Sequence, residues 1–306
     1  MKRCIFVAAM SLALAAPGFA WDSDRYKEDF SQSFKLNPNA RVNIESFNGS
    51  IEITGWDQNQ VEITGTKFAS EESILKTLKV DITNTADSIT VRAVRPSDLG
   101  WNRGGAGVKF VVRVPKKAQL ERIQTSNGRL RVESIDGNVR LTTSNGSINA
   151  SRVNGAMDLT TSNGPIELMD VNGGMMLRTS NGQIRVENAK GAFEASTSNG
   201  SIRARLDAPK GSSIRATSSN GSVELTLPAY DGNDVRVTTS NSAITLRLPP
   251  TVNANLRAVT SHASVSADYD VTTRSIEKGR LEGKIGNGGA LIDLSSSNGA
   301  IRVQKI

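Results

Sequence analysis

The sequence predicts an all-β protein: a parallel β-solenoid with coils of 18–21 residues, each of two short strands and two glycine turns, capped by an N-terminal β region. Three observations predict this fold. The four-residue motif TSNG, or a close variant of it, recurs every 18 and later every 21 residues. A weaker repeat of nine residues divides each interval, and apolar residues alternate after each glycine. A fixed internal period of this size is the sequence signature of a solenoid.

The chain begins with a pattern that is typical of a secretory signal peptide. Lys2 and Arg3 precede an apolar run at 5–16, and small residues follow up to Ala20. We therefore expect cleavage after Ala20, which removes residues 1–20 and exports the rest. The periplasm is the expected location, and the cell surface or the medium are alternatives. Cys4, the only cysteine, leaves with the signal, so neither a disulfide nor a thiolate metal site is expected.

The charge of the chain is modest and evenly spread. Removing Lys2 and Arg3 from the 37 basic residues leaves 35 against 30 acidic ones, a net charge of +5. No basic cluster stands out, so we do not expect nucleic acid as a partner. No later segment reaches the roughly 18 apolar residues that a membrane helix requires, so no transmembrane segment is expected in the mature chain.

The segment before the regular repeats is expected to cover one end of the solenoid. After a leader at 21–40, residues 41–115 contain a degenerate repeat with Asn48-Gly49 and further strands at 78–82, 88–91 and 108–114. A short helix is predicted to start near 70–72. Such a cap is needed because a stack of coils exposes unpaired strand edges at its ends.

Residues 116–306 hold the repeats, with an irregular insertion at 268–284. Asn-Gly or Asp-Gly marks most of the turns, because glycine adopts positive φ without steric cost. Apolar residues two and four positions after each glycine predict a short strand with one buried face. The seventh residue after the turn glycine is apolar in one half of a coil, for example Ile135, and is the serine of TSNG in the other half. This phase predicts that the TSNG serines point inward.

The asparagines of the TSNG motif predict a ladder of hydrogen-bonded side chains at one corner of the coils. Equivalent side chains in stacked coils lie about 4.8 Å apart, so their amides can bond to their own copies. The predicted ladder consists of Asn127, Asn145, Asn163, Asn181, Asn199, Asn220, Asn241 and Asn298.

Several motifs together resemble a known family. They are an early segment at 44–56, a V-x-V-P-K step at 112–116, the serial T-S-N-G-x-I coils, and a closing segment at 286–301. This combination resembles the bacterial "putative adhesin" domain-of-unknown-function family of exported β-solenoid proteins. The resemblance covers nearly the whole mature chain and implies an envelope or surface location with a role in adhesion, but it defines no active site. The chain departs from the pattern at Ser242, His262 and Ala263.

No catalytic constellation, metal site or cofactor site emerges from the sequence. Equivalent outward positions in adjacent coils do not place two acidic residues side by side. Glu167 and Asp158, which could approach each other across an edge of the solenoid, are the one candidate acid/base pair. His262 is the only histidine. Three functions stay open: a non-catalytic exported envelope protein with an adhesin-like binding or structural role, which is favoured and is not an enzyme; a polysaccharide-processing β-helix lyase or hydrolase; and an ice- or mineral-binding solenoid.

Two groups of residues are candidates for binding an anion or a glycan. Arg215, Arg236 and Arg257 recur every 21 residues at one outward strand position, so they are predicted to form a basic strip over three successive coils. Trp101 and Arg103, in the glycine-rich stretch GWNRGGAG, could contact a sugar. The partners expected for such sites are an acidic glycan, a lipid headgroup or an envelope protein.

Overall fold

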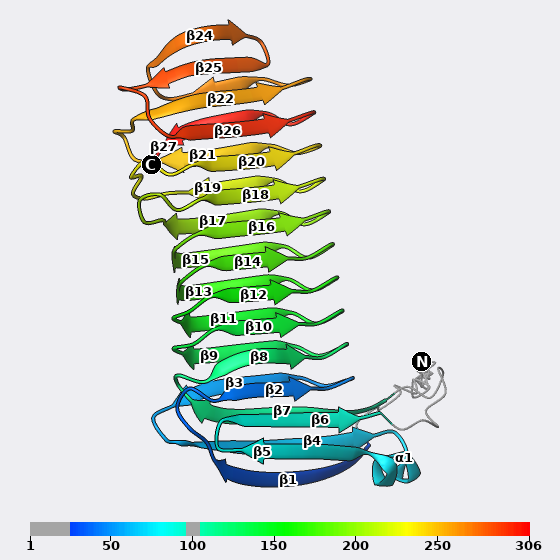
Figure 1. The fold of residues 1–306 in the computed structure, drawn as a ribbon. Helices are drawn as coiled ribbons and strands as arrows, with labels where there is room; N and C mark the ends of the chain where they lie inside the picture. The colour runs from blue at the N-terminus through cyan, green and yellow to red at the C-terminus, as the bar shows by residue number, and fades with distance from the viewer. Residues whose placement is uncertain (1–24, 96–104) are drawn as a thin grey trace, which may run out of the picture.

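Residues 25–95 and 105–306 are described by the computed structural model, and they form an elongated stack of two β-sheets that face each other (Figure 1). The predicted fold class is confirmed, because the chain is nearly all-β, with two long parallel sheets and an antiparallel N-terminal cap. One short helix in the described residues, α1 (Glu72–Thr77), lies where the sequence predicts it.

The first sheet, which we call sheet A, contains 13 strands. In spatial order they are β1 (Tyr26–Lys35), β4 (Gln60–Ala69), β7 (Ala106–Pro115), β3 (Ile51–Trp56), β9 (Leu130–Ile135), β11 (Ile148–Val153), β13 (Ile166–Asn172), β15 (Ile184–Lys190), β17 (Ile202–Asp207), β19 (Val223–Thr226), β21 (Ile244–Leu248), β27 (Ile301–Lys305) and β23 (Val265–Ala267).

The second sheet, sheet B, contains 14 strands. From the N-terminal end they are β5 (Lys79–Thr85), β6 (Ser88–Val94), β2 (Arg41–Glu45), β8 (Gln119–Gln124), β10 (Val139–Thr142), β12 (Met157–Thr160), β14 (Met175–Arg178), β16 (Phe193–Thr197), β18 (Ile214–Ser218), β20 (Val235–Thr239), β26 (Leu291–Ser296), β22 (Ala254–Thr260), β25 (Arg280–Ile285) and β24 (Val271–Glu277).

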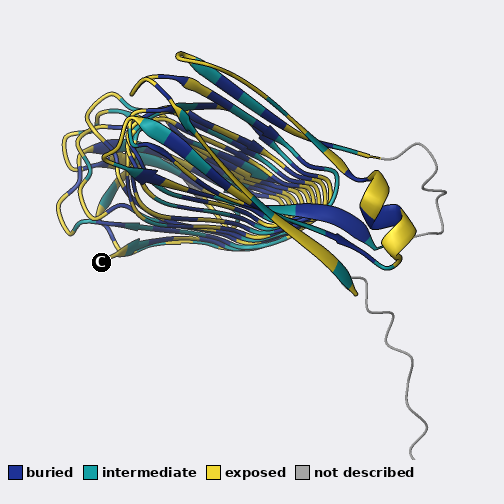
Figure 2. Ribbon diagram, turned by 90° about the horizontal axis from the view of Figure 1, so that it is seen from below, coloured by how far each residue is buried: buried dark blue, intermediate teal, exposed yellow. Residues whose placement is uncertain are grey.

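Coils in the middle of the stack follow chain order. Each coil gives one strand to sheet B and the next to sheet A, and equivalent residues pair in parallel register, as Ile148 does with Leu130 and Ile166. The inward side chains of both sheets build a continuous core. Figure 2, seen from the end where β1 lies, shows this core as dark blue inner positions between yellow outer ones. The alternation is the one that the period-two pattern predicts.

The TSNG corner buries a different side chain from the one predicted. The threonine is buried and the serine is exposed, as at Thr161 and Ser162. A left-handed residue in one half of each regular coil, such as Asp170 (φ 54°), shifts the phase so that Val171 points inward. In the described coils the other half lacks this residue, so its alternation continues to the threonine. Left-handed residues occupy the same coil position at Ser134, Arg152, Asp170 and Asn188.

The buried threonine hydroxyls are fully hydrogen-bonded. Thr161 donates from Oγ1 to the carbonyl oxygen of Gly146 in the preceding coil (3.0 Å) and accepts a bond from the Gly164 N–H (3.3 Å). The same pair of bonds recurs at Thr143, Thr179 and Thr197. A buried hydroxyl requires such partners, and here they also tie each coil to its neighbour.

The TSNG glycines are required by close backbone approach. Positive φ was the predicted reason, but Gly164 is not among the residues with positive φ, so this prediction was wrong at that turn. A Cβ atom on Gly164 would lie 1.8 Å from the carbonyl oxygen of Gly146. Positive φ occurs at the glycines of the other turn, for example 138° at Gly173.

Both ends of the stack depart from chain order, and they do so in the same way. At the N-terminal end the coil of β2 and β3 lies between the outer coil of β6 and β7 and the first regular coil, β8 and β9. At the C-terminal end the last coil, β26 and β27, lies between β20–β21 and β22–β23. The first and the last coil of the solenoid are therefore each covered by an outer coil.

Antiparallel strands close both ends. Strands β1 and β4 extend sheet A beyond β7, and β5 extends sheet B beyond β6. The sequence predicts 21–40 as a leader preceding the domain, but 26–35 form β1, which pairs with β4 along its whole length. At the other end the irregular insertion at 268–284 contributes most of the hairpin of β24 and β25, which pairs with β22.

Candidate functional site

The structure brings the eight ladder asparagines together in one column at a corner of the coils. From Asn145 onward, each Nδ2 donates to the Oδ1 of the asparagine in the coil before it, over 2.6–2.8 Å. Asn298 bonds to Asn241 although 57 residues separate them, because the last coil is inserted beside β20 and β21. These amides are exposed, yet each one holds its neighbour, so the ladder connects the coils along the stack.

The outward side chains of sheet B form a column of mixed charge. Arg140 and Asp158 are paired at 3.3 Å, and the column continues through the remaining coils to the C-terminal hairpin. Its register-paired members are Arg140, Asp158, Met176, Glu194, Arg215, Arg236, Asp293, Arg257 and Glu282.

The three arginines of the predicted strip do not lie in three successive coils. Asp293 of the inserted coil lies between Arg236 and Arg257, 3.3 Å from Arg236 Nη2 and 2.7 Å from Arg257 Nη1. Arg257 Nε also lies 3.3 Å from Glu282 Oε1 on its far side. The predicted adjacency was therefore wrong for Arg257, because the sequence period counts coils in chain order and the last coil is inserted out of that order.

Arg215 and Arg236 do lie side by side, as register partners on β18 and β20. Arg215 is exposed and has no side-chain hydrogen bond or ion pair with any described residue. The Arg236 side chain is 58% exposed and has Asp293 as its partner. The next outward residues on the same strands are Thr217 and Thr238. We call these four residues the Arg215–Arg236 patch.

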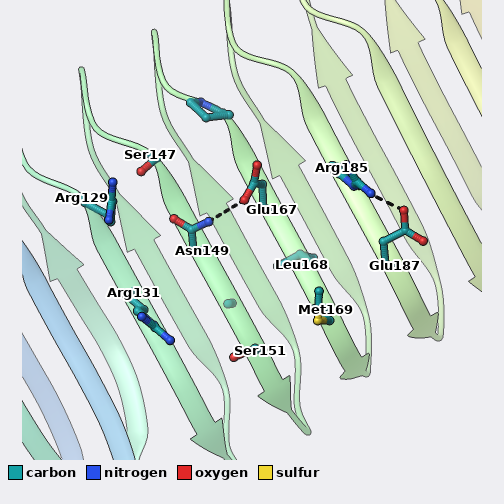
Figure 3. A pocket seen from close by; sticks show the side chains of 12 residues that line it. Arg129, Arg131, Ser147, Asn149, Ser151, Glu167, Leu168, Met169, Arg185 and Glu187 are labelled. Carbon is teal, nitrogen blue, oxygen red and sulfur yellow. Dashed lines mark hydrogen bonds and ion pairs between the residues drawn. The ribbon is translucent and has the colours of Figure 1, made fainter.

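The outer face of sheet A carries an open groove across β9, β11, β13 and β15 (Figure 3). Its volume is about 690 Å³. Short side chains of β11 and the residue before it form the floor, with the arginines at β9 on one side. Glu167 and Met169 of β13, and beyond them the side chains of β15, lie on the other side. At the centre, Asn149 Nδ2 donates to Glu167 Oε2 over 2.8 Å. We call this the sheet A groove.

The two carboxylates considered as a catalytic pair lie on different sheets. Asp158 on β12 of sheet B is held by Arg140 and by Arg178, whose Nη1 is 3.7 Å away. Glu167 on β13 of sheet A bonds to Asn149 on the opposite outer face. The core lies between these faces, so the two carboxylates cannot flank one glycosidic bond.

Metal-ligating residues are scattered in the part of the chain that the structure describes, which holds no group of three or more histidine, cysteine or acidic side chains arranged for a metal ion. His262 stands at a turn position equivalent to the ladder asparagines, with Nδ1 3.3 Å from the carbonyl oxygen of Ser297. This contact with a backbone carbonyl supports a structural role for His262, at a turn where other coils have asparagine.

Groups with perturbed acidity belong to structural contacts outside the patch and the groove. A hydrogen bond from Arg247, together with weaker interactions from Arg203, lowers the pKa of Glu224 on sheet A. Burial raises the pKa of Tyr230 and of Tyr269 to about 12. Tyr269 Oη donates to the carbonyl oxygens of Leu248 (2.9 Å) and Pro249 (2.8 Å), which fixes the chain near its C-terminal end.

Two predicted features lie outside the described residues. They are the signal peptide at 1–20 and the Trp101–Arg103 pair. In the described residues no helix has the length and apolar character that crossing a membrane requires.

The fold and its faces define a class of protein: a parallel β-solenoid whose coils are tied by inward threonines and outward asparagines and whose outer sheet faces are charged. The chain belongs to the Toastrack DUF4097 family, whose profile matches residues 39–304. The family resemblance that the motifs predict is thereby confirmed. Curated proteins offer no match to the sequence.

Several solved structures are similar to this chain at low sequence identity and low TM-score. A "putative adhesin" from Bacteroides fragilis is 15% identical with a TM-score of 0.35, and the alignment covers 91% of this chain and 97% of that one. A "putative cell adhesion protein" from Clostridium sporogenes is 10% identical (TM-score 0.26; 91% and 100% covered). A "putative lipid binding protein" from Parabacteroides distasonis is 11% identical (TM-score 0.42; 91% and 96% covered). These similarities concern the fold and do not identify a ligand.

Proposed function

We propose that this chain is an exported, non-catalytic cell-envelope protein that binds an acidic polysaccharide through the Arg215–Arg236 patch. Membership of a family with adhesin-like relatives supports a binding role. The basic start and the apolar run at 5–16 support export, with the periplasm as the location.

The observation that carries the proposal is the position of Arg215. Like charges placed side by side on a sheet are unfavourable, and Arg236 is the direct cross-strand neighbour of Arg215. An acidic group bound between the two guanidinium groups would give Arg215 a partner and remove the repulsion. Guanidinium suits this role because its planar fork pairs bidentately with carboxylate, sulfate or phosphate. The hydroxyls of Thr217 and Thr238 add two neutral donors beside it.

A polymer fits the patch better than an anionic membrane surface does. Glu194 flanks the patch on one side and Asp293 on the other. A flat anionic surface would meet these two carboxylates together with the two arginines, whereas a single acidic group on a polymer contacts the arginines alone.

The non-catalytic part of the proposal rests on the distribution of carboxylates. Glycoside hydrolysis uses two carboxyl groups roughly 5–9.5 Å apart, and Asp158 and Glu167 lie on opposite faces. An ice-binding role has less support, because outward positions mix arginine, acid and methionine in place of a regular threonine array.

The test compares retention on an immobilised acidic polysaccharide and on vesicles that contain an anionic phospholipid, at low and at high salt. The double variant Arg215→Gln/Arg236→Gln should bind the polysaccharide at least about tenfold more weakly, and wild-type binding should fall with salt. Arg257→Gln is the matched control, because Asp293 and Glu282 already hold that arginine. Equal retention of the double variant and wild type would overturn the proposal, as would retention on vesicles alone. Release of shortened products from the polysaccharide would overturn its non-catalytic part.

A further inference from the structure

The sheet A groove lies on the other sheet from the Arg215–Arg236 patch and has no part in the function proposed above. We propose that it is a second binding site, which takes a short saccharide carrying a carboxylate. Asn149 and Glu167 would hold the sugar hydroxyls, and Arg129 would hold the carboxylate.

The size of the groove follows from the lengths of the outward side chains. Ser147, Asn149 and Ser151 follow one another on and just before β11, so one coil has a low surface. Arginines rise from β9 on one side, and Arg185 and Glu187 rise from β15 on the other (Figure 3). Three strand spacings separate β9 from β15, so the groove extends over about 14 Å along the stack, with Glu167 and Met169 of β13 inside it. The volume of about 690 Å³ falls within the roughly 300–1,000 Å³ typical of ligand sites.

The floor favours a ligand that is rich in hydroxyl groups. The amide of Asn149 is committed to Glu167, so what these two side chains present to a ligand is mainly carboxylate and amide oxygen, which accept hydrogen bonds. Sugar hydroxyls supply the matching donors. Met169, which is 54% exposed, lines the same groove and offers an apolar contact for the C–H face of a sugar ring.

An extended peptide is a poorer fit to the same surface. Strand β11 is paired with β9 on one side and with β13 on the other, so its backbone N–H and C=O groups are used within the sheet. Recognition by strand addition needs a free edge, and this groove has none. Any ligand must be held by side chains alone, and those present are amide, carboxylate, hydroxyl and guanidinium.

The charge balance of the groove places the carboxylate of the ligand at Arg129. Arg131 lies 3.3 Å from Glu133, which Arg152 also contacts, and Arg185 lies 3.3 Å from Glu187, so both arginines already have an acidic partner. Arg129 is exposed and has no side-chain hydrogen bond or ion pair among the described residues. It is therefore the cation of the groove that is open to a bidentate carboxylate.

The experiment uses the full mature chain and three probes: an oligouronate tetramer, a neutral glucan tetramer and a sulfated glucan tetramer. Saturation-transfer NMR detects contact, and calorimetry measures Kd. The wild type should bind the oligouronate most tightly. Asn149→Ala/Glu167→Gln should weaken oligouronate and neutral-tetramer binding about tenfold or more, since hydrogen bonds to charged groups are lost. Arg129→Gln should weaken oligouronate binding about tenfold and leave neutral-tetramer binding unchanged.

Two matched variants separate this site from the patch. Thr142→Ala/Thr160→Ala alters outward residues on sheet B and should bind like wild type. Arg215→Gln/Arg236→Gln should also keep its affinity for the neutral tetramer, which carries no acidic group for the patch. Loss of tetramer binding in that variant, with full binding in Asn149→Ala/Glu167→Gln, would overturn the groove site and leave the patch standing. Absence of saturation transfer to both the uronate and the neutral tetramer would also overturn it. Unchanged melting of each variant shows that the fold is intact.

Discussion

In the middle of the stack each coil lies beside its neighbours in the sequence, whereas at both ends one coil is inserted out of order. The middle is a simple repeat, so the residue 18 positions away is also the residue in the next coil, as Ile148 and Ile166 are. At the C-terminal end this rule fails. Val265 and Ile244, 21 positions apart, are separated by Ile301 of the last coil.

The difference teaches how a solenoid can protect its first and last coils. A linear stack of coils is held only by nearest neighbours, so it opens most easily from its terminal repeats. Here the first and the last coil each have partners on both sides. Opening must start in the outer coils and the antiparallel caps, which, apart from β1, belong to the interior of the sequence. The following predictions test whether middle and ends differ as described.

The largest effect is expected in the regular middle, from Gly164→Val. A Cβ there would lie 1.8 Å from the Gly146 carbonyl oxygen, so the coils must separate locally, and we expect a loss of about 4 kcal/mol or more, or no folding. Gln183→Val, at an exposed position before β15, should change stability by less than about 0.5 kcal/mol. Urea denaturation measures both, and equal midpoints would contradict the coil register. Gly211→Ala, in an open loop with φ of +81°, should cost about 1–2 kcal/mol.

The second prediction concerns the inserted coil. Ile301 of β27 is fully buried, and its register partner Val265 on β23 is half-buried and nearer the end of the stack. Ile301→Ala should destabilise the protein by about 3 kcal/mol, and Val265→Ala by about 1 kcal/mol. Chemical denaturation of the two variants provides the comparison. The reverse order would mean that the chain terminus frays and that the last coil is not held inside the stack.

The third prediction concerns Asp293, the carboxylate that separates Arg236 from Arg257. Asp293→Asn should leave two arginines without their shared anion and cost about 1–2 kcal/mol at low salt. The loss should shrink in about 1 M salt, because screening weakens the repulsion between the exposed guanidinium groups. Thermal melts at the two salt concentrations measure this. A loss that does not depend on salt would show that Asp293 acts through packing.

The fourth prediction distinguishes the two side chains of the TSNG corner. Thr161→Val keeps the shape but removes the bonds to the Gly146 carbonyl oxygen and from the Gly164 N–H, so it should cost about 1–2 kcal/mol. Ser162→Ala changes an exposed side chain and should fall within about 0.5 kcal/mol of wild type. If the serine variant were the less stable one in urea, the burial of the corner would be the reverse of that described.

The smallest effect is expected from Glu224, which joins three coils of sheet A through Arg203 and Arg247. Hydrogen bonding to Arg247 lowers the folded-state pKa of Glu224 below its ordinary value of 4.5. Its contribution to stability is therefore present above the unfolded-state pKa and is lost as pH falls through the lower folded-state pKa. Glu224→Gln should cost less than about 1 kcal/mol at pH 7, and the difference should shrink as the pH falls below 4.5 and vanish below the folded-state pKa. Denaturation across this pH range measures it, and a constant difference would contradict it.

The regular middle could be predicted almost fully from the sequence, because one local rule repeats there. The turn asparagines recur every 18 residues, and their side chains meet at that spacing in the structure. The inward threonine was missed because the left-handed residue at Ser134 and its equivalents changes the phase in one half of the coil. No glycine marks that position, so the residue types gave no sign of the shift.

The candidate site was less predictable than the fold, because it depends on neighbours that are distant in the sequence. The column of Arg131, Asn149, Glu167 and Arg185 follows from the 18-residue period and exists in the structure. The groove depends further on the short side chains of β11 beside longer ones and on the lack of a partner for Arg129. Only the structure shows these two features. Asp293 between Arg236 and Arg257 was unpredictable, since no periodicity indicates where the last coil is inserted.

The asparagine ladder has a consequence for the chemical lifetime of the protein. All ladder asparagines except Asn241 precede glycine, the sequence in which the following backbone nitrogen most readily attacks the side-chain amide, expels ammonia and forms a succinimide. In the stack the Gly164 N–H is bonded to Thr161, and the Asn163 amide is held by Asn145, so neither atom is free to approach the other. We expect the folded chain to resist deamidation and the urea-unfolded chain to lose ammonia at these sites. Water then opens each succinimide to aspartate or isoaspartate, so mass spectrometry would detect a gain of about 1 Da per site. A molecule that stays unfolded long enough for this reaction would thus carry a permanent record of having done so.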